Sequence, residues 1–168
     1  GCLVGGANSL STIENSYGRG SVDASPYVGG IVGLSDGSQM INCYSTALID
    51  GFGGGLVGYN WQSVVDSCYW DIETSGMSAS NGGTGKTTSE MKNIMTFVNG
   101  NWDFKLLGAE EIWNIGNGRN DGYPYLVCQY PGDPGPSGPV PPAVVLDSIS
   151  DLTSTTPTAN GNITVLGI

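Results

Sequence analysis

An internal repeat of about 25 residues is the feature that most constrains how this chain can fold. The segments GCLVG, GGIVG and GGLVG begin at residues 1, 29 and 54. A second block follows each of them, namely IENSYGRGSV, MINCYSTALI and VVDSCYWDIE, and the tyrosines Tyr17, Tyr44 and Tyr69 align within these blocks. Two landmarks that recur in the same order with nearly the same spacing predict a repeat architecture.

Short β-prone runs within each unit predict the shape of one repeat. In the second unit, residues 31–34, 40–44 and 47–49 are such runs, separated by Gly, Ser, Asn and Asp. One unit cannot bury its own apolar side chains, so successive units are expected to stack about 4.8 Å apart with parallel strands. The predicted fold class is all-β: a short parallel β-solenoid (β-helix) of about three coils, with a capping extension and an isolated β segment.

Like residues would then form columns along the stack. Ile13, Met40 and Val65 make an apolar column, and the three tyrosines make an aromatic one. The repeated glycines are expected to serve the backbone, through positive φ and through close approach between coils, and they need no ligand. These motif glycines are Gly29, Gly30, Gly33, Gly54, Gly55 and Gly58.

These residues resemble the GLUG motif family, named for a Gly-Leu-hydrophobic-Gly core, seen here as GGIVG and GGLVG with the INCYST and VDSCYWD blocks that follow. The resemblance covers roughly residues 1–76, with family-like material to about residue 126. The first unit departs most, because Cys2 and Ser16 stand where the other units have glycine and cysteine. The resemblance implies a large bacterial or archaeal surface or secreted protein of the adhesin or haemagglutinin kind, and it carries over no catalytic residue.

The chain changes character after the third unit. Thr87 and Glu90 fit a capping box, and apolar residues follow at helical spacing, which predicts a helix over about 88–97 that closes the open end of the solenoid. A Pro- and Gly-rich linker comes later. The predicted parts are solenoid coils at 1–76, a capping extension at 77–130 with short strands after the helix, the linker at 131–142 and a β segment at 143–168.

The last segment, residues 143–168, resembles the opening of a fibronectin- or immunoglobulin-like surface module. Its 26 residues are too few for such a sandwich, which takes about 100. Two alternatives remain open: the segment is the start of a following domain, or it is a strand donated to another subunit.

The charge balance excludes several classes of partner. A formal net charge of -10, from 5 Lys and Arg against 15 Asp and Glu, argues against nucleic acid and anionic membranes. The absence of histidine removes the commonest general base and the usual zinc ligand. No run approaches the roughly 20 apolar residues that span a bilayer, and the sequence starts at Gly1 without Met and without the basic and apolar regions of a signal peptide. We therefore expect a mature segment or fragment of an extracellular or cell-surface protein.

The four cysteines lack the spacing of a zinc or redox site. Cys43 and Cys68 occupy one repeat column, and stacking would bring their Cα atoms to about 5 Å, within disulfide range. A disulfide and a buried ladder of free thiols are equally good interpretations of this pair. Cys2 and Cys128 have no predicted partner.

Carboxylates offer the remaining route to enzyme chemistry. Asp66, Asp71 and Glu73 lie on the third unit, and glycoside hydrolysis needs two carboxyl groups about 5 to 9 Å apart in a groove. A solvated acidic face is the favoured interpretation of these residues, so the chain is predicted not to be an enzyme.

Two further patterns suggest bound ligands and are weak. GGTGKTT resembles the end of a phosphate-binding loop, but Ser80 stands where the signature needs glycine. The acidic residues also suggest a surface calcium site, although neither an EF-hand loop nor a calcium-binding nonapeptide is present.

The expected function is a non-catalytic structural or adhesive module of a secreted or cell-surface protein, one variant being a filament subunit assembled by β-strand pairing. The alternative is a carbohydrate-binding or carboxylate-dependent polysaccharide-active β-helix. Expected partners are other copies, neighbouring surface domains and glycans, without nucleic acid or membrane insertion. The tryptophans either stack on sugar rings or fill a core; they are Trp61, Trp70, Trp102 and Trp113.

Overall fold

The computed structural model divides into two compact units, Gly1–Ser137 and Gly138–Ile168. It describes residues 1–23, 26–105, 111–136, 143–146 and 163–166. Most of the regular structure is β-strand, the sheets of the repeat region are parallel, and the helices are few and short. The all-β prediction is confirmed.

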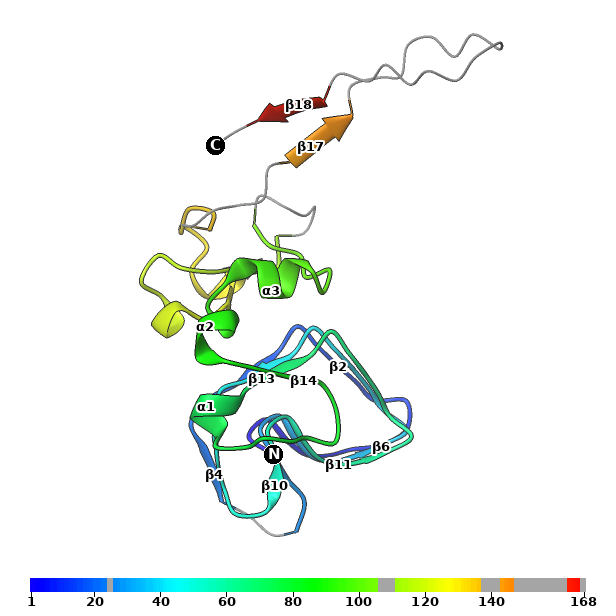
Figure 1. Cartoon of the computed structure of the whole chain (residues 1–168). Helices are drawn as coiled ribbons and strands as arrows, with labels where there is room; N and C mark the ends of the chain where they lie inside the picture. The colour runs from blue at the N-terminus through cyan, green and yellow to red at the C-terminus, as the bar shows by residue number, and fades with distance from the viewer. Residues whose placement is uncertain (24–25, 106–110, 137–142, 147–162, 167–168) are drawn as a thin grey trace, which may run out of the picture. The chain divides into compact units, whose positions relative to one another are not determined.

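Equivalent strands of successive repeats pair in parallel, and Figure 1 shows their traces running side by side around a common path. Three sheets hold most of these strands: β1 (Val4–Ala7), β6 (Val32–Asp36) and β11 (Val57–Trp61); β2 (Thr12–Glu14), β7 (Gln39–Ile41) and β12 (Val64–Asp66); and β3 (Tyr17–Gly18), β8 (Tyr44–Ser45), β13 (Tyr69–Asp71) and β14 (Thr84–Lys86). Two shorter pairs are β4 (Ser21–Asp23) with β9 (Leu48–Asp50) and β5 (Val28–Gly29) with β10 (Gly53–Gly54).

The strand register reproduces the columns expected from the repeat. The aligned sets are Val4, Val32 and Val57; Ile13, Met40 and Val65; Tyr17, Tyr44 and Tyr69; and Val22 with Ile49. The first two columns enter one apolar cluster inside the stack, together with Cys43, Cys68 and Trp70. Val32 and Met40 in the second layer are fully buried, because a layer covers them on each side.

Stacking continues beyond the predicted break at residue 76. The Gly55 amide donates to the Ala79 carbonyl at 3.1 Å, and the Val57 amide donates to the Ser80 hydroxyl at 2.9 Å. β14 then pairs with β13 in parallel. Residues 79–86 therefore continue the hydrogen bonding of the third repeat, and α1 (Ile72–Ser75) and a loop precede them.

The extension begins with two short helices where the sequence predicts one over about 88–97. α2 (Thr88–Met91) starts with the expected capping box of Thr87 and Glu90. α3 (Ile94–Val98) starts anew because the Asn93 side chain accepts a hydrogen bond from the Met95 amide. The chain continues through β15 (Trp113–Asn114), η1 (Asn120–Gly122), β16 (Tyr125–Leu126) and η2 (Val127–Gln129), and β15 pairs with β16 in antiparallel fashion.

The extension packs along the side of the stack that carries the tyrosines. Tyr44 and Tyr69 share a buried cluster with Phe97, Trp102 and Trp113 of the extension. The sequence predicts that the helical segment closes the open end of the stack, whereas the helices join this lateral cluster. The physical reason is that the tyrosine rings point out of the layers and lose their contact with water only when the extension covers them.

The second unit contains the antiparallel pair of β17 (Ala143–Leu146) and β18 (Ile163–Leu166), with Ala143 opposite Leu166. Residues 137–142 of the predicted linker lie outside the described residues, as do residues 147–162 and 167–168. The two alternatives for this segment, a following domain or a donated strand, stay predictions.

Candidate functional site

The tyrosine column is the joint between the repeats and the extension. The rings of Tyr17 and Tyr44 are stacked, with centroids 5.2 Å apart and an interplanar angle of 6°. Tyr17 donates its hydroxyl hydrogen bond to Gln129 Oε1 at 3.0 Å. The Tyr44 hydroxyl accepts from Asn120 Nδ2 at 2.7 Å and donates to the Pro124 carbonyl at 2.5 Å. The column therefore binds another part of the same chain.

The motif glycines are sites of close backbone approach. A Cβ atom on Gly33 would lie 2.6 Å from the Tyr27 carbonyl oxygen and 2.7 Å from that of Gly5. On Gly58, it would lie 2.5 Å from the Val28 carbonyl oxygen. Five of the six motif glycines have backbone contacts of this kind, whereas Gly55 lies against the side chain of Trp70, and none of the six has a positive φ. Steric clearance, and not left-handed backbone, is therefore the reason for glycine here.

Asp71, one of the three candidate carboxylates, is fully buried and has a structural role. Its Oδ1 accepts from the amides of Glu73 and Thr74 at 2.9 and 3.1 Å, which caps α1. Its Oδ2 accepts from the hydroxyls of Thr88 and Tyr123, both at 2.7 Å. These four bonds join the third repeat, α2 and the extension.

The other two candidate carboxylates differ from Asp71 in their burial. Asp66 and Glu73 are both exposed, and Glu73 Oε2 accepts from the Thr88 amide at 2.8 Å. Burial, together with the hydrogen bond to Asp71, raises the pKa of Tyr123 to about 12, so this hydroxyl stays a donor at neutral pH.

Replacing Asp71 tests this structural role. We expect Asp71→Asn to lower the free energy of unfolding by about 1 to 3 kcal/mol, because the amide nitrogen that replaces one carboxylate oxygen cannot accept a hydrogen bond. Either the two backbone amides or the two hydroxyls that donate to Asp71 would then lose their acceptor. Urea unfolding followed by circular dichroism measures the change. The exposed Asp66→Asn is the matched control and should stay within about 0.5 kcal/mol of the parent. Equal effects of the two substitutions would contradict the role.

Cys43 and Cys68 are buried neighbours in successive layers, and the structure holds both as free thiols. The Cys43 amide donates to Cys68 Sγ at 3.3 Å. The thiols lie 3.2 Å from the Ile41 carbonyl oxygen and 3.0 Å from the Asp66 carbonyl oxygen, respectively. The side-chain interaction with the Cys43 thiol, together with burial, raises the pKa of the Cys68 thiol, which keeps it protonated and unreactive. A disulfide between them stays a prediction, and Cys2 and Cys128 are exposed.

The GGTGKTT segment serves the fold. Its residues 84–86 form β14, and the helix that follows has four residues, too short for a phosphate-binding loop. Ser80, at the position where that signature needs glycine, is bonded to the third repeat, and Lys86 lies 3.5 Å from Glu90 Oε1. Within the described ranges, no group of three or more acidic or cysteine side chains is placed to hold a metal ion.

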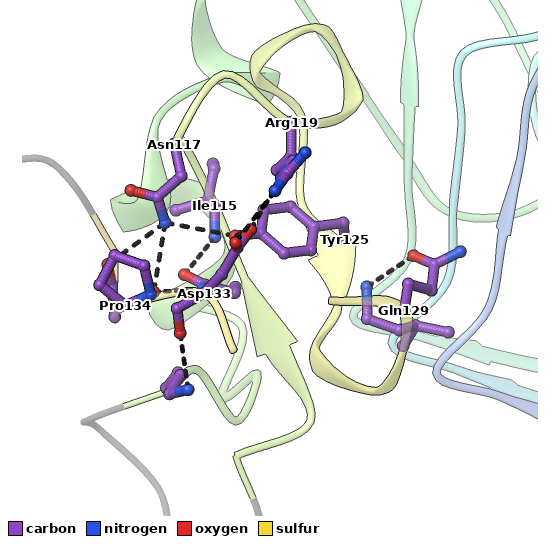
Figure 2. Close-up of polar contacts among 11 residues, drawn as sticks. Ile115, Asn117, Arg119, Tyr125, Gln129, Asp133 and Pro134 are labelled. Atoms are coloured by element: carbon purple, nitrogen blue, oxygen red, sulfur yellow. Dashed lines mark hydrogen bonds and ion pairs between the residues drawn. The ribbon is translucent and has the colours of Figure 1, made fainter. Parts of the chain in front are cut away.

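A polar network holds the chain from residue 130 to 135 against the extension (Figure 2). Arg119 Nε donates to Asp133 Oδ2 at 2.9 Å, and the Tyr125 hydroxyl donates to the same oxygen at 3.1 Å. The Pro134 carbonyl accepts from Asn114 and Asn117 at 2.7 and 3.2 Å. The first part of the predicted linker, residues 131–135, is thus attached to the extension.

Comparison with known proteins agrees with this repeat geometry. Residues 24–49 match the GLUG motif. The matched segment is the second repeat, and it contains Gly29, Gly30, Gly33 and Tyr44. The GLUG resemblance stated from sequence is therefore confirmed for this segment, whereas the fibronectin- or immunoglobulin-like resemblance of residues 143–168 stays a prediction.

One relative extends beyond the GLUG motif itself. A protein of Evansella cellulosilytica, named as a Gly-rich membrane protein, is 31% identical over 149 residues, which cover 80% of this chain and 16% of the relative. The chain therefore spans about one sixth of the length of that protein. No solved structure matches the chain. Among the residues that the structure describes, no helix has the length and apolarity to cross a bilayer.

Proposed function

We propose that residues 1–86 are a β-solenoid and that the chain is a non-catalytic spacer module of a secreted or cell-surface protein. The observation that carries the proposal is the register. Each repeat aligns three positions with those of its neighbour: a valine, an apolar residue that is Ile13, Met40 or Val65, and a tyrosine. This solenoid would have three coils and a shortened fourth layer at residues 79–86. Such a stack keeps its ends at a fixed separation, because every layer is hydrogen-bonded to the next.

The first layer of the stack offers a face for extension. In the described part of the chain, β1, β2, β3 and β4 each pair with one strand only. Val4 and Ile13 are half-buried, while Val32 and Met40 in the same columns are fully buried. Unpaired backbone groups beside half-covered apolar side chains favour pairing with a further repeat of the same kind. The adhesive or filament role would use this face, toward a neighbouring surface domain or another copy.

Adding one repeat tests the solenoid directly. A copy of residues 29–53 is placed before Gly1, which keeps the repeat in phase because Gly54 follows residue 53 in the native chain. We expect the midpoint of thermal unfolding to rise by about 4 °C or more, since the added layer buries the first-layer columns. Hydrogen exchange should slow in β1 and β2.

The control carries the same added residues in shuffled order. It should leave both the midpoint and the exchange rates of β1 and β2 unchanged. If the in-phase copy behaves like the shuffled copy, the first layer does not accept another repeat and the solenoid proposal fails.

A further inference from the structure

Three large aromatic side chains are exposed together on one face of the repeats. Tyr27, Tyr59 and Trp61 have relative exposures of 48%, 37% and 55%. The rings of Tyr27 and Tyr59 lie 5.0 Å apart at an interplanar angle of 46°. Trp61 follows Tyr59 by two residues on β11, so both project from the same side of that strand. We call these three residues the aromatic platform.

The backbone conformation that holds Tyr27 in the platform is strained. Tyr27 has a φ of 65°, a left-handed conformation that is strained for a bulky side chain. The Tyr27 backbone crosses directly over two motif glycines, since a Cβ on Gly33 or on Gly58 would lie 2.6 or 2.7 Å from Tyr27 backbone atoms. Strain of this kind persists only where the surrounding structure holds it. The motif glycines thus allow the approach that sets Tyr27 beside Tyr59.

The other tryptophans differ from Trp61 in their surroundings. Trp70, Trp102 and Trp113 are buried, in agreement with a core role. The side chains of the aromatic platform are not part of a core. Burying them against a partner would remove apolar surface from water, which favours binding. It is therefore a contact surface.

The charge around the platform selects the class of partner. No lysine or arginine occurs between Arg19 and Lys86, and Asp36 is paired in register with Trp61. Anionic partners would meet no compensating charge, and a second copy of this chain would carry the same net charge of -10. Pyranose rings of neutral glycans suit the surface, because their C–H faces stack on aromatic faces and their hydroxyls can donate to a carboxylate.

We propose that Tyr27, Tyr59 and Trp61 form a binding site for the sugar rings of a neutral polysaccharide. The proposal is independent of the spacer function, because sugar binding does not require the module to hold its two ends at a fixed separation. Each ring of the platform would cover one face of a sugar, and Asp36 would accept from a sugar hydroxyl.

Intrinsic tryptophan fluorescence gives a direct test, since Trp61 is the exposed one of the four tryptophans. The probes are the neutral hexasaccharides of cellulose, chitin, xylan and mannan, with oligogalacturonate as the anionic comparison. At least one neutral probe should change the emission in a saturable manner, and oligogalacturonate should not. Saturable binding of oligogalacturonate alone would overturn the proposal, as would a lack of binding by all probes at about millimolar concentration.

Variants locate the site. Tyr59→Ala and Trp61→Ala should each weaken binding about tenfold or more, measured by isothermal calorimetry. Tyr27→Gly should weaken it similarly while keeping a cooperative unfolding transition, because glycine adopts the positive φ without strain. Leu48→Ala, which alters an exposed apolar residue on β9, is the matched control and should bind like the parent. Unchanged binding in Tyr59→Ala and Trp61→Ala, or self-association that depends on Trp61, would overturn the proposal.

Discussion

Gly33→Ala should destabilise the protein by about 2 kcal/mol or more, although it adds a single methyl group. The new Cβ would lie 2.6 and 2.7 Å from the carbonyl oxygens of Tyr27 and Gly5. Both are backbone atoms, so they cannot move away by a change of side-chain rotamer. The layers would have to separate locally, which lengthens the hydrogen bonds between β1 and β6. Chemical unfolding of the variant measures the loss.

Gly5→Ala is a control at the same motif position. Gly5 and Gly33 are equivalent in the register of β1 and β6, but no atom lies within 4 Å of a Cβ built on Gly5. We expect no loss of stability there, since alanine also reduces the entropy of the unfolded chain. In the chain extended by one repeat, Gly5→Ala should become costly. Equal costs at Gly5 and Gly33 in the native chain would show that close approach is not the reason for glycine.

Tyr44→Ala should cost about 3 to 5 kcal/mol, the largest effect expected of any single truncation here. Tyr44 is fully buried, stacks on Tyr17 and touches Phe97 and Trp113, so its removal leaves a cavity between the repeats and the extension. Hydrogen exchange should accelerate first in α3, because the extension loses its main attachment.

Two companion variants separate the contributions at Tyr44. Tyr44→Phe retains the ring and loses the bonds to Asn120 and Pro124, so it should cost about 1 to 2 kcal/mol. Tyr59→Ala removes a tyrosine that is exposed and should stay within about 1 kcal/mol of the parent. If Tyr44→Ala costs no more than Tyr59→Ala, the tyrosine column does not hold the extension.

The free-thiol pair and the buried carboxylate show why a candidate site is hard to read from sequence. Cys43 and Cys68 share a repeat column, which predicts proximity but not their redox state. Asp71 is one of three acidic residues on the third unit, and its burial and its bonds to Thr88 and Tyr123 distinguish it from a solvated acid. These partners are 17 and 52 residues away along the chain, so no local pattern indicates them.

The repeat by itself determined which residues stack. Its spacing places Ile13, Met40 and Val65 in one column and the three tyrosines in another, because parallel pairing in register aligns like positions of successive units. The same pattern identified the motif glycines and the GLUG resemblance.

Only the tertiary structure decided which side of each layer is covered, and by what. The tyrosines point outward because the extension buries them, and residues 79–86 are hydrogen-bonded to the third repeat although they share no motif with the repeats. Tyr27 and Tyr59 meet because the backbone crosses the glycines of neighbouring layers. These outcomes depend on contacts between segments of unlike sequence, whereas the stacking of the repeats depends on a local pattern that occurs three times in the sequence.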